Sequence, residues 1–276
     1  MDRSIKITVV ILVTALMCSL TMAQENPSEK FTIELTDPES PATVDIKWQV
    51  EGDVTVMGYE GNTVEIEITD RQGSTYRNRD SWKRRNDSAG LRRIEVGGNK
   101  LIIQENRNLV NIKYRYGSIY ADAVIKVPKS SNLYVHTIED GNVYIENVDG
   151  DIDVKCNDGE VVELKNVSGS VIANALDGDI FATFTSMNSD KPMMFKSLDG
   201  VIDLTFPQDL KATFNITAIE GGLYTDFEID LNSEWVKEDH RSGYLMSRVS
   251  KGTINGGGTE ITLYALDDDI IIRKKK

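Results

Sequence analysis

Acidic side chains recur at short intervals through the middle of the chain, where two kinds of chemistry could use them. Asp149, Asp151 and Asp153 alternate with other residues, and Ca²⁺ prefers several carboxylate oxygens as ligands. A pair of carboxylates on the outside of a β-helix could also cleave glycosidic bonds. The candidates for such a pair are Asp151, Asp153, Asp179 and Asp203. Calcium binding and polysaccharide cleavage are therefore the two chemical hypotheses.

Both hypotheses lack the sequence patterns that normally accompany them. Calcium-binding nonapeptide rolls repeat a G-G-x-G-x-D phrase in every unit, and neither that phrase nor a 12-residue EF-hand loop occurs here. The two histidines, His136 and His240, lie in different regions, and no motif places either near a serine nucleophile. We therefore expect no metal, no cofactor and no catalytic residue.

The acidic residues belong instead to a repeat whose fixed point is a glycine. The residues two and four places after it are mostly apolar, as Val143 and Ile145 are after Gly141, and this alternation predicts a short strand with one buried face. Glycine reaches positive φ without steric cost, and an Asp before it can bond its own backbone, so each glycine is a predicted turn. The turn glycines are Gly141, Gly150, Gly159, Gly169, Gly178 and Gly200.

One unit departs from this alternation. Counted from Gly159, the alternation predicts that Val161 points inward and Val162 outward, and that Glu163 takes the next inward position. A one-residue bulge would bring Leu164 inward instead.

The spacing of the glycines predicts how the strands are arranged. These glycines lie nine or ten residues apart up to Gly178, and the gaps from Gly178 to Gly200 and from Gly200 to Gly221 are 22 and 21 residues. Two strands and two corners therefore make a coil of about 18–22 residues. A β repeat of this length favours a parallel β-solenoid (β-helix), in which each coil buries its inward face on the next. An antiparallel β-sandwich is the alternative, because short strands at regular spacing also suggest that fold.

Three segments resemble a known family. They are PMMFKSLDGVIDLTFP (192–207), GGLYTDFEID (221–230) and GTINGGGTEITLYALDDDIIIRK (252–274). They are similar to the bacterial putative-adhesin family of β-strand-repeat proteins, a domain of unknown function akin to head-domain putative autotransporter adhesins. The resemblance runs from about Phe31 to Lys274. It implies a right-handed β-solenoid outside the cytoplasm and brings no known catalytic residues. Asp267-Asp268-Asp269 departs from the usual Asn-Gly, which implies a strained or rebuilt turn.

The amino terminus has the layout of a secretory signal. Arg3 and Lys6 precede an apolar run over residues 7–20, and small residues allow cleavage after Ala23. The run is short for a permanent span, which needs about 20 residues, although a retained anchor is the alternative. We therefore expect residues 1–23 to be a signal peptide and 24–276 a single β-solenoid domain, not membrane-spanning and located in the periplasm or at the cell surface. Cys156 would then be the one cysteine, so no internal disulfide could form.

Two regions are candidate interaction sites. Tyr144, Val162 and Phe181 lie 18 and 19 residues apart and should stack on one outer face, either under a covering segment or as a contact surface. Segment 71–93 carries eight Arg and Lys against two Asp. We expect it to be a basic loop that interrupts the solenoid, and contact with anionic envelope material is the alternative. Its candidate contact residues are Tyr76, Trp82, Lys83, Arg84 and Arg85.

These patterns together favour a non-enzymatic, exported, adhesin-like β-solenoid that mediates surface or envelope interactions. The ligand, protein or glycan, is not specified by the sequence. The net charge of −13 argues against nucleic acid. Two alternatives remain: a carbohydrate-active lyase or hydrolase on a β-helix, and an envelope-stress signalling component that binds another protein.

Overall fold

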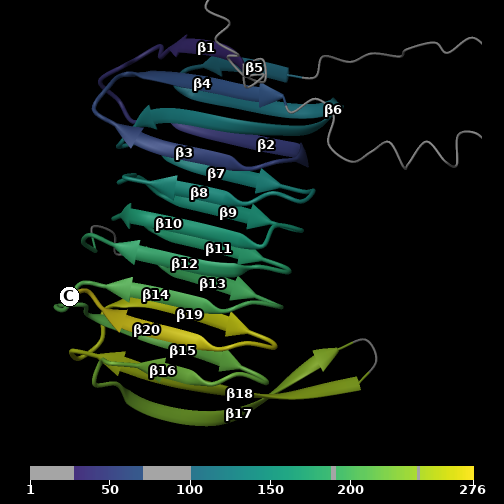
Figure 1. Ribbon diagram of the computed structural model, residues 1–276. Helices are drawn as coiled ribbons and strands as arrows, with labels where there is room; N and C mark the ends of the chain where they lie inside the picture. The colour runs from purple at the N-terminus through teal and green to yellow at the C-terminus, as the bar shows by residue number, and fades with distance from the viewer. Residues whose placement is uncertain (1–27, 71–100, 188–190, 241–242) are drawn as a thin grey trace, which may run out of the picture.

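The structure of the protein is a stack of short β-strands in two facing sheets (Figure 1). It is a computed structural model that describes residues 28–70, 101–187, 191–240 and 243–276. These residues form 20 strands. Within the same ranges there is no α-helix, and hence none able to cross a bilayer.

The strands divide between sheets A and B, and β6 contributes to both. Sheet A runs in spatial order through β1 (Ser28–Glu34), β4 (Thr63–Asp70), the second half of β6 (Leu109–Pro128), β3 (Val54–Tyr59), β8 (Val143–Glu146), β10 (Val161–Val167), β12 (Asp179–Phe184), β14 (Ile202–Phe206), β20 (Ile270–Lys274) and β16 (Leu223–Thr225). Sheet B runs through β5 (Leu101–Asn106), the first half of β6, β2 (Thr43–Glu51), β7 (Asn132–Thr137), β9 (Ile152–Cys156), β11 (Val171–Ala175), β13 (Met193–Ser197), β19 (Thr259–Ala265), β15 (Ala212–Ala218), β18 (Gly243–Ile254) and β17 (Asp230–His240).

The body of the stack is a parallel β-solenoid, as predicted. Val143 lies opposite Val162, which lies opposite Ile180, which lies opposite Ile202. The intervals along the chain are 19, 18 and 22 residues, so the predicted coil length is confirmed. Each coil is one sheet B strand followed by one sheet A strand, such as β7–β8 or β9–β10. The antiparallel sandwich is excluded because these neighbours run parallel.

The order of the coils departs from the order of the chain at both ends. Coil β2–β3 lies between β6 and coil β7–β8. Coil β19–β20, which ends the chain, lies between coils β13–β14 and β15–β16 (Figure 1). Antiparallel strands cover the outermost coils: β4, β1 and β5 at one end, and the β17–β18 hairpin at the other. The first and last coils are therefore held inside the stack, not at its edges.

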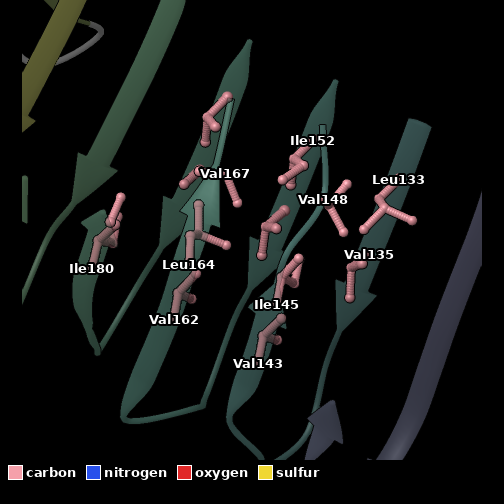
Figure 2. Close-up of a cluster of buried hydrophobic side chains, with 14 of the residues drawn as sticks. Leu133, Val135, Val143, Ile145, Val148, Ile152, Val162, Leu164, Val167 and Ile180 are labelled. Atoms are coloured by element: carbon pink, nitrogen blue, oxygen red, sulfur yellow. The ribbon is translucent and has the colours of Figure 1, made fainter. Parts of the chain in front are cut away.

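The inward side chains of the two sheets form one apolar core. Figure 2 shows Leu133 and Val135 of β7 beside Val143 and Ile145 of β8, and the same pattern repeats in the neighbouring coils. Aromatic side chains fill the core towards both ends. Phe184 stacks on Phe206 with ring centroids 4.8 Å apart, and Trp48 stacks on Tyr114 at 4.7 Å. Burial of this core is the main source of stability, because the described chain contains no disulfide.

The turn glycines do stand at corners, but the predicted reason for them is wrong in most cases. Only Gly200 among the six has a positive φ, of 151°. A Cβ on Gly141 would lie 2.1 Å from the carbonyl oxygen of Gly52, and one on Gly159 would lie 2.1 Å from that of Gly141. Glycine is needed here because each corner rests directly on the backbone of the next coil.

At several corners the polar residue that follows the glycine accepts a backbone hydrogen bond from the neighbouring coil. The side-chain oxygen Oδ1 of Asp53 accepts a hydrogen bond from the Asn142 backbone N–H at 2.9 Å, and Asn142 Oδ1 accepts one from Val161 at 2.8 Å. The same kind of bond between coils occurs at the corner formed by residues 267–269, where Asp269 Oδ1 accepts a hydrogen bond from the Gly222 backbone N–H at 2.8 Å. None of the residues 267–269 has a positive φ. The acidic repeat therefore links adjacent coils through backbone amides.

Replacing Asn142 with alanine should lower the free energy of unfolding by about 1–2 kcal/mol, because the Val161 amide loses its acceptor. Asp158 is the control, since it precedes Gly159, is exposed and makes no side-chain hydrogen bond within the described chain. Asp158→Ala should change stability by no more than about 0.5 kcal/mol. Urea unfolding measures both, and equal losses would show that the residue before the glycine is also structural.

Candidate interaction face

The outer face of sheet B carries a row of basic side chains in register. Lys47 of β2 lies opposite Lys113 of β6 on one side and His136 of β7 on the other, and His136 lies opposite Lys155 of β9. Asn174 of β11 follows, and then Lys196 of β13. Neighbouring strands are about 4.8 Å apart, so four basic groups follow one another at that spacing. We call Lys113, Lys47, His136, Lys155 and Lys196 the basic row.

A second outward row lies two residues earlier on the same strands. Its exposed apolar members are Tyr134, Ile172 and Met194, with exposed fractions of 50%, 39% and 41%. Asp45 and Asp153 flank Tyr134 on the adjacent strands β2 and β9. We call Tyr134, Ile172 and Met194 the apolar row. Large apolar side chains aligned on one face are typical of a contact surface.

The two rows meet in a shallow groove of about 190 Å³. The Tyr134 side chain lies in it between Asp45 and Asp153, and His136 lies between Lys47 and Lys155. The groove therefore offers an aromatic ring, two carboxylates that accept hydrogen bonds, two lysine ammonium groups and an imidazole within three neighbouring strands. Because these strands belong to a parallel sheet packed on the core, the side chains are held on a rigid support.

Fewer basic side chains form ion pairs on the outer face of sheet B than on that of sheet A. Lys47 Nζ lies 3.2 Å from Asp45, but neither Lys113 nor Lys155 forms an ion pair within the described part of the chain. Lys196 Nζ lies over the Tyr264 ring, 4.9 Å from its centroid. Sheet B thus presents two lysines, Lys113 and Lys155, that form no ion pair with a described carboxylate.

On the outer face of sheet A, each basic side chain is paired. Lys165 Nζ lies 2.8 Å from Glu163 Oε1, and this hydrogen bond raises the pKa of Lys165. Lys126 contacts Glu65 at 3.4 Å. Arg273 makes a bidentate contact with Asp203 at 2.9 and 3.0 Å. A charged ligand would have to compete with these pairs, so sheet A is the weaker candidate.

The predicted stripe on sheet A is only partly correct. Tyr144 and Phe181 are half-buried and point outward, but the residue between them is Glu163. Val162 is completely buried. Its placement was wrong because an extra residue stands at the corner: Val143 and Val162 are 19 residues apart, whereas Gly141 and Gly159 are 18 apart.

This shift also removes the predicted bulge before Leu164. Val162 and Leu164 alternate inward with Glu163 outward between them, and the irregularity in β10 falls between Lys165 and Val167. Burial raises the pKa of the Tyr144 phenol.

The predicted basic loop at 71–93 lies outside the described residues. Its candidate contact residues are Tyr76, Trp82, Lys83, Arg84 and Arg85.

Most of the carboxylates considered for catalysis or calcium already have structural partners. Asp179 Oδ1 accepts the Val201 amide at 2.7 Å, and Asp203 is held by Arg273. Asp151 accepts the Ser170 amide at 3.1 Å and binds Lys191 Nζ at 2.6 Å. Asp149 accepts from the Ser168 hydroxyl at 2.7 Å. In the described ranges, no three His, Cys, Asp or Glu side chains are grouped closely enough to hold a metal ion.

Cys156 offers no nucleophile at the surface. Its side chain points into the core, and burial raises the pKa of the thiol. The neutral thiol, not the thiolate, is therefore the form expected at neutral pH.

Comparison with known proteins identifies a family over the second half of the chain. The profile of the Toastrack DUF4097 family matches residues 129–273. No curated protein matches.

Three solved structures match the chain weakly. A putative cell adhesion protein from Clostridium sporogenes shares 11% identity over 91% of this chain and 100% of its own, with a TM-score of 0.43. A putative adhesin from Bacteroides fragilis shares 10% over 90% and 97%, with a TM-score of 0.27. A putative lipid binding protein from Parabacteroides distasonis shares 12% over 90% and 97%, also at 0.27. Similarity this weak carries no argument about function.

Proposed function

Because the chain belongs to the Toastrack DUF4097 family, as its resemblance to β-strand-repeat adhesins implied, we propose that it is an exported, adhesin-like binding protein without enzymatic activity. Residues 1–23 direct export, and residues 24–276 act in the periplasm or at the cell surface. The contact surface is the outer face of sheet B, and its partner is an anionic component of the cell envelope.

One observation carries this proposal: the basic row has Lys113 and Lys155 without ion-pair partners in the described chain, in a protein whose net charge is −13. A cation without a partner can bind an anion without first breaking an existing pair. Side chains on adjacent strands of a rigid sheet also lose less freedom on binding than those on a mobile loop. Charge of one sign along one face increases the rate of encounter with an opposite charge.

Removing two of these charges tests the proposal. The chain without residues 1–23 should cosediment with isolated cell envelopes of the bacterium that produces it. The double variant Lys113→Gln/Lys155→Gln should bind about tenfold more weakly or worse, since each cation near an anionic surface contributes about 1 kcal/mol. Raising the salt concentration should weaken binding by the wild type, because exposed charges are screened.

The matched control removes two cations from the opposite face. Lys126→Gln/Lys165→Gln changes the net charge equally but leaves the basic row intact, so binding should stay within about twofold of wild type if only sheet B makes contact. Equal losses in both variants would contradict a sheet B contact surface. Turnover of oligosaccharides by the purified protein would contradict the non-enzymatic part of the proposal.

A further inference from the structure

We infer that the groove around Tyr134 holds a sugar unit of an acidic polysaccharide, and that the polysaccharide chain runs across the strands along the basic row. This inference rests on the proposed function and names the ligand class of the same face. It follows from the combination of groups in the groove, from its size and from the direction of the basic row.

The groove combines the groups that a sugar ring requires. The Tyr134 side chain is 50% exposed, and an exposed aromatic ring offers a flat apolar surface to the C–H groups on one face of a pyranose. Asp45 and Asp153 lie on the strands on either side of it. Their carboxylates accept hydrogen bonds from hydroxyl groups. The volume of about 190 Å³ is enough for one sugar ring.

The basic row indicates that the sugar is acidic. Lys47, His136 and Lys155 border the same groove, and Lys155 has no ion-pair partner in the described ranges. A uronic acid would place its carboxylate against these groups and its hydroxyls against Asp45 and Asp153. A neutral sugar would leave the basic row unused.

The two carboxylates argue against a lipid bilayer as the ligand. A surface of anionic headgroups would meet Asp45 and Asp153 as well as the lysines, and like charges repel. A polysaccharide that alternates hydroxyl and carboxylate groups satisfies both kinds of side chain. Lys113 of β6, next to Lys47, and Lys196 of β13, beyond Asn174, extend the row past the groove in both directions. Several units of one chain could therefore bind together, which strengthens binding through effective concentration.

Calorimetry with defined polymers tests this inference. The probes are oligomers of polygalacturonate, alginate and hyaluronate as uronic acid polymers, dextran as a neutral polymer, and vesicles of phosphatidylglycerol and phosphatidylcholine. We expect at least one uronic acid polymer to bind, with dextran and vesicles at least tenfold weaker. Tyr134→Ala should weaken that binding at least fivefold, and Lys155→Gln should also weaken it, by a factor that decreases as the salt concentration is raised. Tyr224→Ala, on the outer face of sheet A and 57% exposed, should leave it unchanged.

Failure of this inference is distinguishable from failure of the proposed function. Absence of binding to all three uronic acid polymers, tighter binding to the vesicles, or equal effects of Tyr134→Ala and Tyr224→Ala would overturn the glycan assignment. Envelope binding that still depends on Lys113 and Lys155 would leave the proposed function standing. Envelope binding that is indifferent to those lysines would overturn both.

Discussion

Replacing Gly141 with alanine is expected to lower the free energy of unfolding by at least about 4 kcal/mol, which places it among the largest single-residue effects. The new Cβ would lie 2.1 Å from the Gly52 carbonyl oxygen and 2.8 Å from its carbon. Both are backbone atoms, so no side chain can rotate away. Relief requires two coils to separate at the corner, where the Asp140 carbonyl also accepts the Gly52 amide at 2.8 Å.

Gly256→Ala separates steric contact from backbone strain. Gly256 has a φ of +81°, and a Cβ there would meet nothing within 4 Å. Its replacement should therefore cost only about 1–2 kcal/mol, for the left-handed conformation. Urea unfolding of both variants gives the comparison. A loss at Gly141 no greater than that at Gly256 would contradict close stacking of the corners.

Truncation after Ile254 is expected to release the end of the stack and to lower the melting temperature by more than about 10 °C. The truncation removes β19 and β20, which lie between other strands and not at the edge (Figure 1). Without them β13 and β15 lose their common partner, and Ile261, Leu263 and Ile272 leave the core. Residues 212–254 should become susceptible to protease, while the coils before Phe206 stay protected because each contacts only its neighbours.

Truncation after Lys274 is the matched control. It keeps every pairing of β19 and β20 and removes only Lys275, whose amide donates to the Phe206 carbonyl at 2.8 Å, and Lys276. Its melting temperature should stay within about 3 °C of wild type. If residues 212–254 remain protected after the longer truncation, the last coil does not hold the end of the stack together.

The repeat predicted the coil but could not predict the order of the coils. The glycine corners and the alternation at residues such as Val143 and Ile145 specify a strand with one buried face, and parallel stacking follows from identical units. Every coil, however, offers the same apolar inward positions and the same free backbone groups. Whether β20 pairs with β14 or with an edge therefore depends on how the hairpin β17–β18 returns the chain, which no local pattern encodes.

The basic row corresponds to a short pattern that recurs in the sequence. Ile46-Lys47-Trp48, Ile112-Lys113-Tyr114 and Val154-Lys155-Cys156 share an apolar–Lys–apolar triplet, and in each the lysine alone points outward. Aligning the triplets requires the coil boundaries, because the three are separated by very different lengths of chain. Val162 shows how sensitive this alignment is: one extra residue at a corner moves a side chain from one face of a strand to the other.

Lysine reactivity on bound protein locates the contact surface in a single experiment. The chain without residues 1–23 is acetylated with and without isolated cell envelopes, and each lysine is quantified by mass spectrometry. Contact through sheet B predicts that Lys47, Lys113 and Lys155 become protected while Lys126 and Lys165 react as before. Protection of Lys126 and Lys165 alone, or the same reactivity at all five lysines despite binding, would contradict contact through the outer face of sheet B.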